Sequence, residues 1–109
     1  MTKNIIDWED ADCPDMDENG YPTDGTLQAI IDMPMYEFKD MARFVASAWN
    51  VDYGSFYITA DSLVLITGGW SGNESIISAM KLNMLLWALF WYRSTRGGRF
   101  EFNSGKEQL

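Results

Sequence analysis

The chain has 109 residues, of which 47% are hydrophobic and 15% aromatic, and it carries a formal net charge of −8. This length corresponds to one domain, and so apolar a composition excludes a chain that is disordered throughout. The sequence has no histidine and one cysteine, Cys13, which excludes an internal disulfide, imidazole zinc sites and catalysis by Ser-His-Asp or Cys-His groups.

Residues 1–25 are acidic and rich in proline and glycine, so we expect them to form an irregular N-terminal arm. Thr23 or Asp24 is a suitable cap for a short helix that continues to Ile31. Pro34 separates this helix from a second helical pattern, in which apolar residues recur every three or four positions from Phe38 to Trp49.

Two β-rich runs follow, at residues 55–59 and 62–67, and they predict a hairpin that turns near residues 60–61. Gly68 and Gly69 end the second run. A third helix is predicted next, because Ser71 and Glu74 have the spacing of a capping box, and Asn83 is its expected end.

The stretch 84–94 is apolar and aromatic, which is consistent with a helix or a strand; we favour a strand from about Leu86 onward. Residues 96–99 have turn chemistry, and Phe100 and Phe102 then alternate with polar residues as in a half-exposed strand. The predicted order is α-α-β-β-α-β-β, an α+β domain over residues 26–103 with an antiparallel sheet of about four strands and helices on one face. Residues 104–109 are expected to form a flexible tail.

The loop 68–74 is the most informative candidate ligand site. Its glycines allow close approach of a ligand, the free N–H groups at a helix start favour an anion, and Trp70 offers a stacking surface. If the last hairpin lies beside this loop, its arginines add positive charge. The residues of this candidate site are Gly69, Trp70, Ser71, Gly72, Asn73, Glu74, Trp91, Arg93 and Arg96. The structural alternative is a tight turn, a helix cap and a core tryptophan.

The run GGWSGNESII, followed further along by LLWALFWYRSTRGGRFEF, resembles a family of small uncharacterised proteins of bacteriophages and prophages. The likeness covers residues 65–102 and extends more loosely over residues 21–49. The positions that match are Gly68–Glu74, Trp87–Trp91, Ser94, Arg96, Gly97, Gly98 and Phe100. Members often have histidine after the RGG turn, where this chain has Arg99. The resemblance implies a phage origin, and so action in the cytoplasm of a bacterial host cell, but no established activity.

The negative charge is concentrated before residue 62, where thirteen acidic and three basic residues give a net charge of −10, whereas residues 62–109 carry +2. Such a field repels duplex nucleic acid and membrane surfaces and attracts basic protein grooves. The sequence also lacks the ~20 consecutive apolar residues of a membrane span. The candidate partner-binding residues are Asp7, Glu9, Asp10, Asp12, Asp15, Asp17 and Glu18.

Calcium is a further candidate ligand, because Asp15-x-Asp17-x-Asn19-Gly20 matches the first six positions of an EF-hand loop. The twelfth position is Thr26, however, where the loop needs a glutamate. We therefore expect an Asx-rich turn here and no metal site.

These observations lead to a binding protein without catalytic residues or cofactor. The first hypothesis is a phage accessory protein that inhibits a host defence protein with a basic groove, as an acidic nucleic-acid mimic of the anti-CRISPR or anti-restriction kind. The second is a small-molecule binder, such as a sponge for a signalling nucleotide, that uses the loop 68–74 and the Arg-rich hairpin. A third is a structural protein that forms homodimers or larger oligomers through exposed aromatic residues.

Overall fold

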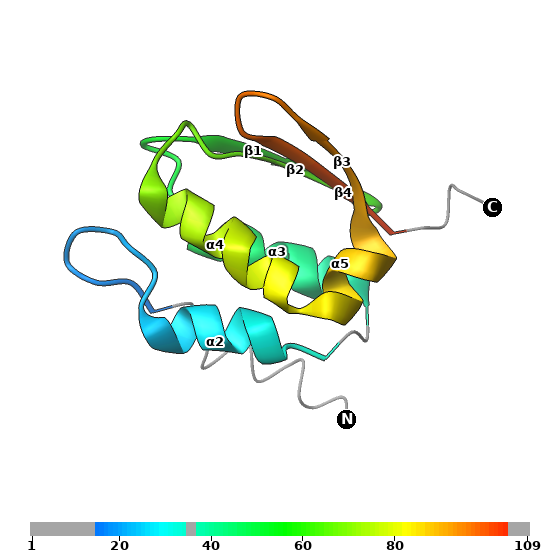
Figure 1. Ribbon diagram of the computed structural model, residues 1–109, viewed down its shortest axis with the longest axis horizontal. Helices are drawn as coiled ribbons and strands as arrows, with labels where there is room; N and C mark the ends of the chain where they lie inside the picture. The colour runs from blue at the N-terminus through cyan, green and yellow to red at the C-terminus, as the bar shows by residue number, and fades with distance from the viewer. Residues whose placement is uncertain (1–14, 35–36, 105–109) are drawn as a thin grey trace.

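The computed structural model describes residues 15–34 and 37–104 (Figure 1). Its antiparallel sheet has the strand order β1-β2-β4-β3, and the helices cover one face of it. The strands are β1 (Ser55–Ile58), β2 (Ser62–Ile66), β3 (Trp91–Thr95) and β4 (Arg99–Asn103). The helices are α2 (Asp24–Asp32), α3 (Phe38–Ala48), α4 (Ser71–Leu82) and α5 (Met84–Phe90). The predicted α+β class and four-stranded antiparallel sheet are therefore confirmed.

The core lies between the sheet and the helical layer formed by α3, α4 and α5. Side chains alternate along a strand, so Leu63 and Leu65 of β2 point to the core while Val64 points to the other face. Phe102 of β4 lies directly opposite Leu63 and is buried with it. Helix α2 packs on α4, on the side of the helical layer away from the sheet (Figure 1), and buries Ile30 there.

Of the two helix caps predicted from the sequence, the structure confirms the one at α2 and contradicts the one at α4. The Thr23 hydroxyl accepts a hydrogen bond from the Thr26 N–H and caps α2, as predicted. The capping box expected at Ser71 and Glu74 is wrong, because Trp70 takes the cap position of α4 and no side chain caps this helix. The Ser71 hydroxyl instead shares a hydrogen bond of 3.1 Å with the Tyr21 hydroxyl.

The strand expected from Leu86 onward is also wrong up to Phe90, because this segment forms helix α5 and the strand begins at Trp91. The cause is Asn83, which ends α4 as predicted and also starts α5. Its side-chain oxygen accepts a hydrogen bond of 3.1 Å from the Leu86 N–H, which caps the new helix. Leu86 and Phe90, one turn apart, are then both buried.

Candidate binding surfaces

The loop between β2 and α4 lies beside the turn of the last hairpin. The Thr67 N–H donates a hydrogen bond of 3.0 Å to the Gly98 carbonyl. A Cβ atom on Gly98 would lie 2.4 Å from the Thr67 hydroxyl, and Gly98 has a φ of +87°, so only glycine fits this approach. The turn of the last hairpin therefore lies beside the loop 68–74, as a ligand site shared by the two would require.

Trp70 packs against other aromatic rings of the chain. Its ring stacks on Tyr53 with a centroid distance of 4.8 Å and an interplanar angle of 16°, and it lies 4.6 Å from the Tyr21 ring. A Cβ atom on Gly72 would lie 2.3 Å from the Trp70 ring, so the indole covers the first turn of α4. The Trp70 indole thus packs within the protein, which agrees with the alternative that this loop is a turn with a core tryptophan.

Asn73 joins two loops inside the protein. Its side chain is completely buried. Its amide nitrogen donates to the carbonyls of Asn50 and Thr67 at 3.1 and 3.4 Å, and its oxygen accepts from the Asn50 N–H at 3.0 Å. Asn73 therefore holds the loop after α3 against the end of β2. The parts of loop 68–74 that face solvent are Gly68, Gly69, Ser71 and Glu74.

Trp91 lies at the end of the hairpin away from the turn, and Arg93 lies in the middle of β3, opposite Glu101. Trp91 pairs with Phe102, whereas Thr95 pairs with Arg99 beside the turn. Arg96 is exposed in the turn itself. The structure thus places the turn that carries Arg96 beside the loop 68–74, whereas Trp91 lies at the far end of the hairpin and Arg93 is bonded to Glu101.

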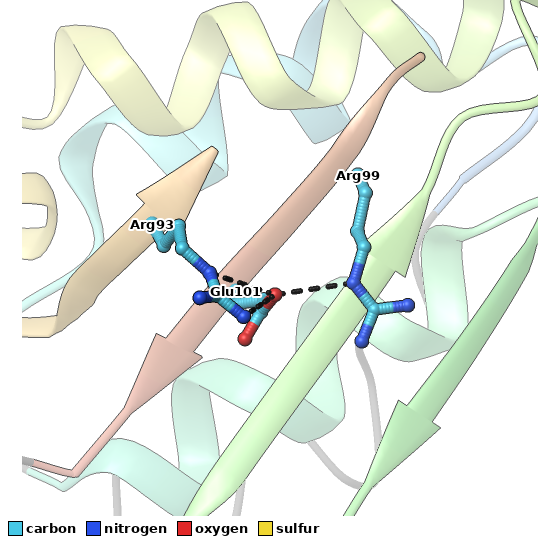
Figure 2. A network of polar contacts seen from close by, with 3 residues as sticks. All are labelled: Arg93, Arg99 and Glu101. Carbon is cyan, nitrogen blue, oxygen red and sulfur yellow. Dashed lines mark hydrogen bonds and ion pairs between the residues drawn. The ribbon is translucent and has the colours of Figure 1, made fainter. Parts of the chain in front are cut away.

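Two of the three hairpin arginines, Arg93 and Arg99, converge on Glu101, on the sheet face away from the helices (Figure 2). One Glu101 oxygen accepts hydrogen bonds from Arg93 Nε at 3.3 Å, Arg93 Nη2 at 3.0 Å and Arg99 Nε at 3.1 Å. The hydrogen bond from Arg99, followed by that from Arg93, lowers the pKa of Glu101 against the opposing effect of burial. Glu101 is not among the site residues predicted from the sequence, although its alternation with Arg99 places both on one face of the strand.

Helix α2, which carries Asp24 and Asp32, lies on the side of the helical layer away from the sheet (Figure 1), and the loop before it carries Asp15, Asp17 and Glu18. Asp17 accepts hydrogen bonds from the N–H groups of Asn19 and Tyr21 at 2.8 and 2.9 Å, which forms the expected Asx turn. Asp15, Glu18, Asp24 and Asp32 are exposed as well. Of the other predicted partner-binding residues, Asp7, Glu9, Asp10 and Asp12 lie outside the described residues. Within the described residues, these five carboxylates thus gather on α2 and the loop before it.

Two further findings concern ligands and membranes. Among residues 15–34 and 37–104, no group of three or more His, Cys, Asp or Glu side chains is arranged to hold a metal ion. No helix in this described part of the chain is long and apolar enough to cross a membrane.

No protein-family model, no curated protein and no solved structure matches the chain. The function proposed for it is therefore inferred from its own surfaces.

Proposed function

We propose that the protein is a phage accessory protein that binds and inhibits a host protein by presenting carboxylates to a basic groove. The observation that carries this proposal is a group of exposed carboxylates on α2 and the loop before it, which we call the acidic surface. Its members are Asp15, Asp17, Glu18, Asp24 and Asp32. Within the described part of the chain, none of them forms an ion pair with Lys or Arg. These carboxylates are therefore available to a cationic partner. The phage origin in this proposal is inferred from the sequence resemblance alone.

The acidic surface is held in place by hydrogen bonds, which supports a role in recognition. The Thr26 hydroxyl donates to the Asp15 carbonyl at 2.7 Å and accepts from the Asp15 N–H at 2.8 Å. Met16 and Pro22 form an isolated β-bridge across the base of the loop. Because the loop is already ordered in the free protein, binding costs less conformational entropy.

The test begins with affinity purification of the tagged protein from a host lysate and identification of the proteins that co-purify. The variant Asp17→Asn/Glu18→Gln/Asp24→Asn/Asp32→Asn then removes four charges from the acidic surface. Asparagine at position 17 keeps the oxygen that accepts the turn hydrogen bonds. We expect its affinity for the purified partner to fall by about 100-fold at low salt, because each rim charge contributes several-fold through steering and pairing.

The control variant Glu37→Gln/Asp52→Asn/Asp61→Asn/Glu74→Gln has the same net charge but leaves the acidic surface intact. We expect its affinity to change by less than about fivefold, since only long-range attraction is reduced. Equal losses in the two variants would show that the net charge acts without a defined surface. An unchanged affinity in the first variant would contradict the proposal.

The binding of an anionic small molecule is a second candidate function. It is favoured by the contact between Thr67 and Gly98, which brings the turn that carries Arg96 beside the loop 68–74. Calorimetry with a panel of nucleotides separates the two candidates. A ligand whose binding is lost in Arg96→Ala but kept in the acidic-surface variant would favour this second function.

A further inference from the structure

Helix α5 has an apolar outer face. Its seven residues, MLLWALF, include no polar side chain. Leu86 and Phe90 are buried, but Met84, Leu85 and Leu89 are 79%, 58% and 51% exposed. At 100° per residue, positions 84, 85, 88 and 89 fall within an arc of about 140°. The apolar outer face is therefore continuous.

Helix α3 shows what an ordinary surface helix of this protein looks like. Its solvent-facing positions, spaced four residues apart, are Lys39, Arg43 and Ser47, while its buried positions are mostly apolar. A helix that is apolar on all sides is normally buried on all sides. The outer face of α5 thus lacks the polar residues that a helix facing only water would carry.

The apolar surface continues beyond both ends of α5. Leu82, in the last turn of α4, is 65% exposed, and Trp91, at the start of β3, is 41% exposed. We call Leu82, Met84, Leu85, Leu89 and Trp91 the α5 patch. Residues 82–92 contain no charged side chain. A contiguous patch of this kind is typical of a contact surface rather than of scattered exposed residues.

The charges that flank the α5 patch are already engaged within the chain. Lys81 Nζ lies 5.7 and 5.8 Å from the ring centroids of Trp87 and Phe100. Arg93 Nη2 lies 3.0 Å from Glu101. Because residues 82–92 carry no charge, the patch offers a charged partner no ion pair at its centre. A second copy of the chain supplies an uncharged apolar surface that matches it.

We propose that the α5 patch is the contact surface of a homodimer, in which α5 packs antiparallel on α5 of a second copy about a twofold axis. A twofold contact uses the same patch on both copies, so Leu85 of one copy lies against Leu89 of the other. This inference is independent of the acidic surface. A twofold dimer through α5 would present two acidic surfaces to a partner at once.

Side-chain packing rather than strand pairing forms this contact. β3 is an edge strand, but a β-bulge between Trp91 and Arg93 interrupts its regular register, and bulges of this kind disfavour edge-to-edge pairing. Stable interfaces bury about 800 Å² per partner, which is more than the exposed parts of five side chains provide. The expected dissociation constant is therefore in the micromolar range, on the order of 10 µM.

The test is sedimentation equilibrium of the full chain at concentrations from about 1 µM to about 1 mM, which bracket this expected dissociation constant. The wild type should pass from monomer to dimer across this range. Leu85→Lys should weaken the dimer by about 100-fold or more, because it introduces a charge at the centre of the contact on both copies. Val51→Lys is the matched control, since Val51 is 61% exposed and lies outside the α5 patch.

Thermal unfolding followed by circular dichroism checks that both variants fold, and Leu89→Lys repeats the test at a second position of the patch. A wild type that stays monomeric at the highest concentration would overturn the proposal, whether the patch is covered by another segment of the chain or by a different partner. A dimer that Leu85→Lys and Leu89→Lys leave unchanged would also overturn it, because the contact would then lie elsewhere.

Discussion

At the scale of single residues, a charged side chain can bind a ligand readily only if it is not already in an ion pair within the protein. The sequence suggests a cationic cluster at Arg93, Arg96 and Arg99 that could hold an anion. In the structure, Arg93 and Arg99 both donate to Glu101 (Figure 2), and of the three arginines only Arg96 has no ion pair within the described residues. A count of charges along the sequence could not show this, because Arg93, Arg99 and Glu101 meet only after the hairpin forms.

The Glu101 network predicts a dependence of stability on pH. The two arginines lower the pKa of Glu101 below the ordinary value of 4.5 in the folded state. A lowered pKa stabilises the fold at pH values above 4.5, and this contribution is lost as the pH falls through the folded-state pKa. Glu101→Gln should therefore be less stable than the wild type at pH 7, and the difference should shrink towards pH 3.

Urea unfolding of both proteins at pH 7 and at pH 3 measures this effect. Glu18→Gln is the control, because Glu18 is exposed and forms no ion pair with another described residue. A stability difference for Glu101→Gln that is equal at the two pH values would contradict the network. So would a difference that grows as the pH falls.

At the scale of elements, the sequence predicts those segments whose periodicity is clear. The sequence predicts α2 and α3, because apolar residues repeat every three to four positions there, and it predicts the β1–β2 hairpin, because two β-rich runs flank a short turn. Helix α5 was missed because it is apolar on all sides and shows neither period. Asn83 starts this helix through a local hydrogen bond from the Leu86 N–H, and contacts with Ile30 and Met33, about fifty positions earlier in the chain, fix its side chain. The long-range contacts have no local signature.

Asn83 is therefore expected to be important for stability, because its side chain connects α2, α4 and α5. Its side-chain nitrogen donates to the carbonyls of Ile30 and Met33, both at 3.0 Å, at the end of α2, while its oxygen caps α5. Asn83→Ala would leave buried backbone groups unpaired, so the free energy of unfolding should fall by about 3 kcal/mol. Urea unfolding measures it, with the exposed Asn19→Ala as the control. A loss below about 1 kcal/mol would show that α5 and the end of α2 do not depend on this side chain.

At the scale of the whole molecule, the sequence has an acidic part before residue 62 and a slightly basic part after it. The fold determines where the charged residues of each part lie in space. Helix α2, with Asp24 and Asp32, packs on the side of the helical layer away from the sheet, whereas the hairpin that carries the arginines belongs to the sheet (Figure 1). The predicted ligand residues of the hairpin, by contrast, are spread along it, with Arg96 in the turn, Arg93 in the middle of β3 and Trp91 at its start. Which of them lies beside the loop 68–74 depends on the long-range contact between Thr67 and Gly98.

The two proposed contacts should respond to salt in opposite directions. Binding of a basic partner to the acidic surface should weaken as salt screens the attraction. The homodimer should tighten, because each copy carries a net charge of −8 and the α5 patch is uncharged. The Debye length falls from about 30 Å at 10 mM salt to about 3 Å at 1 M, so the repulsion between copies is largely removed. Sedimentation equilibrium and partner titration of the same protein at these two salt concentrations measure both trends. A dimer that weakens at high salt would show that ion pairs, rather than the apolar side chains of α5, hold the two copies together.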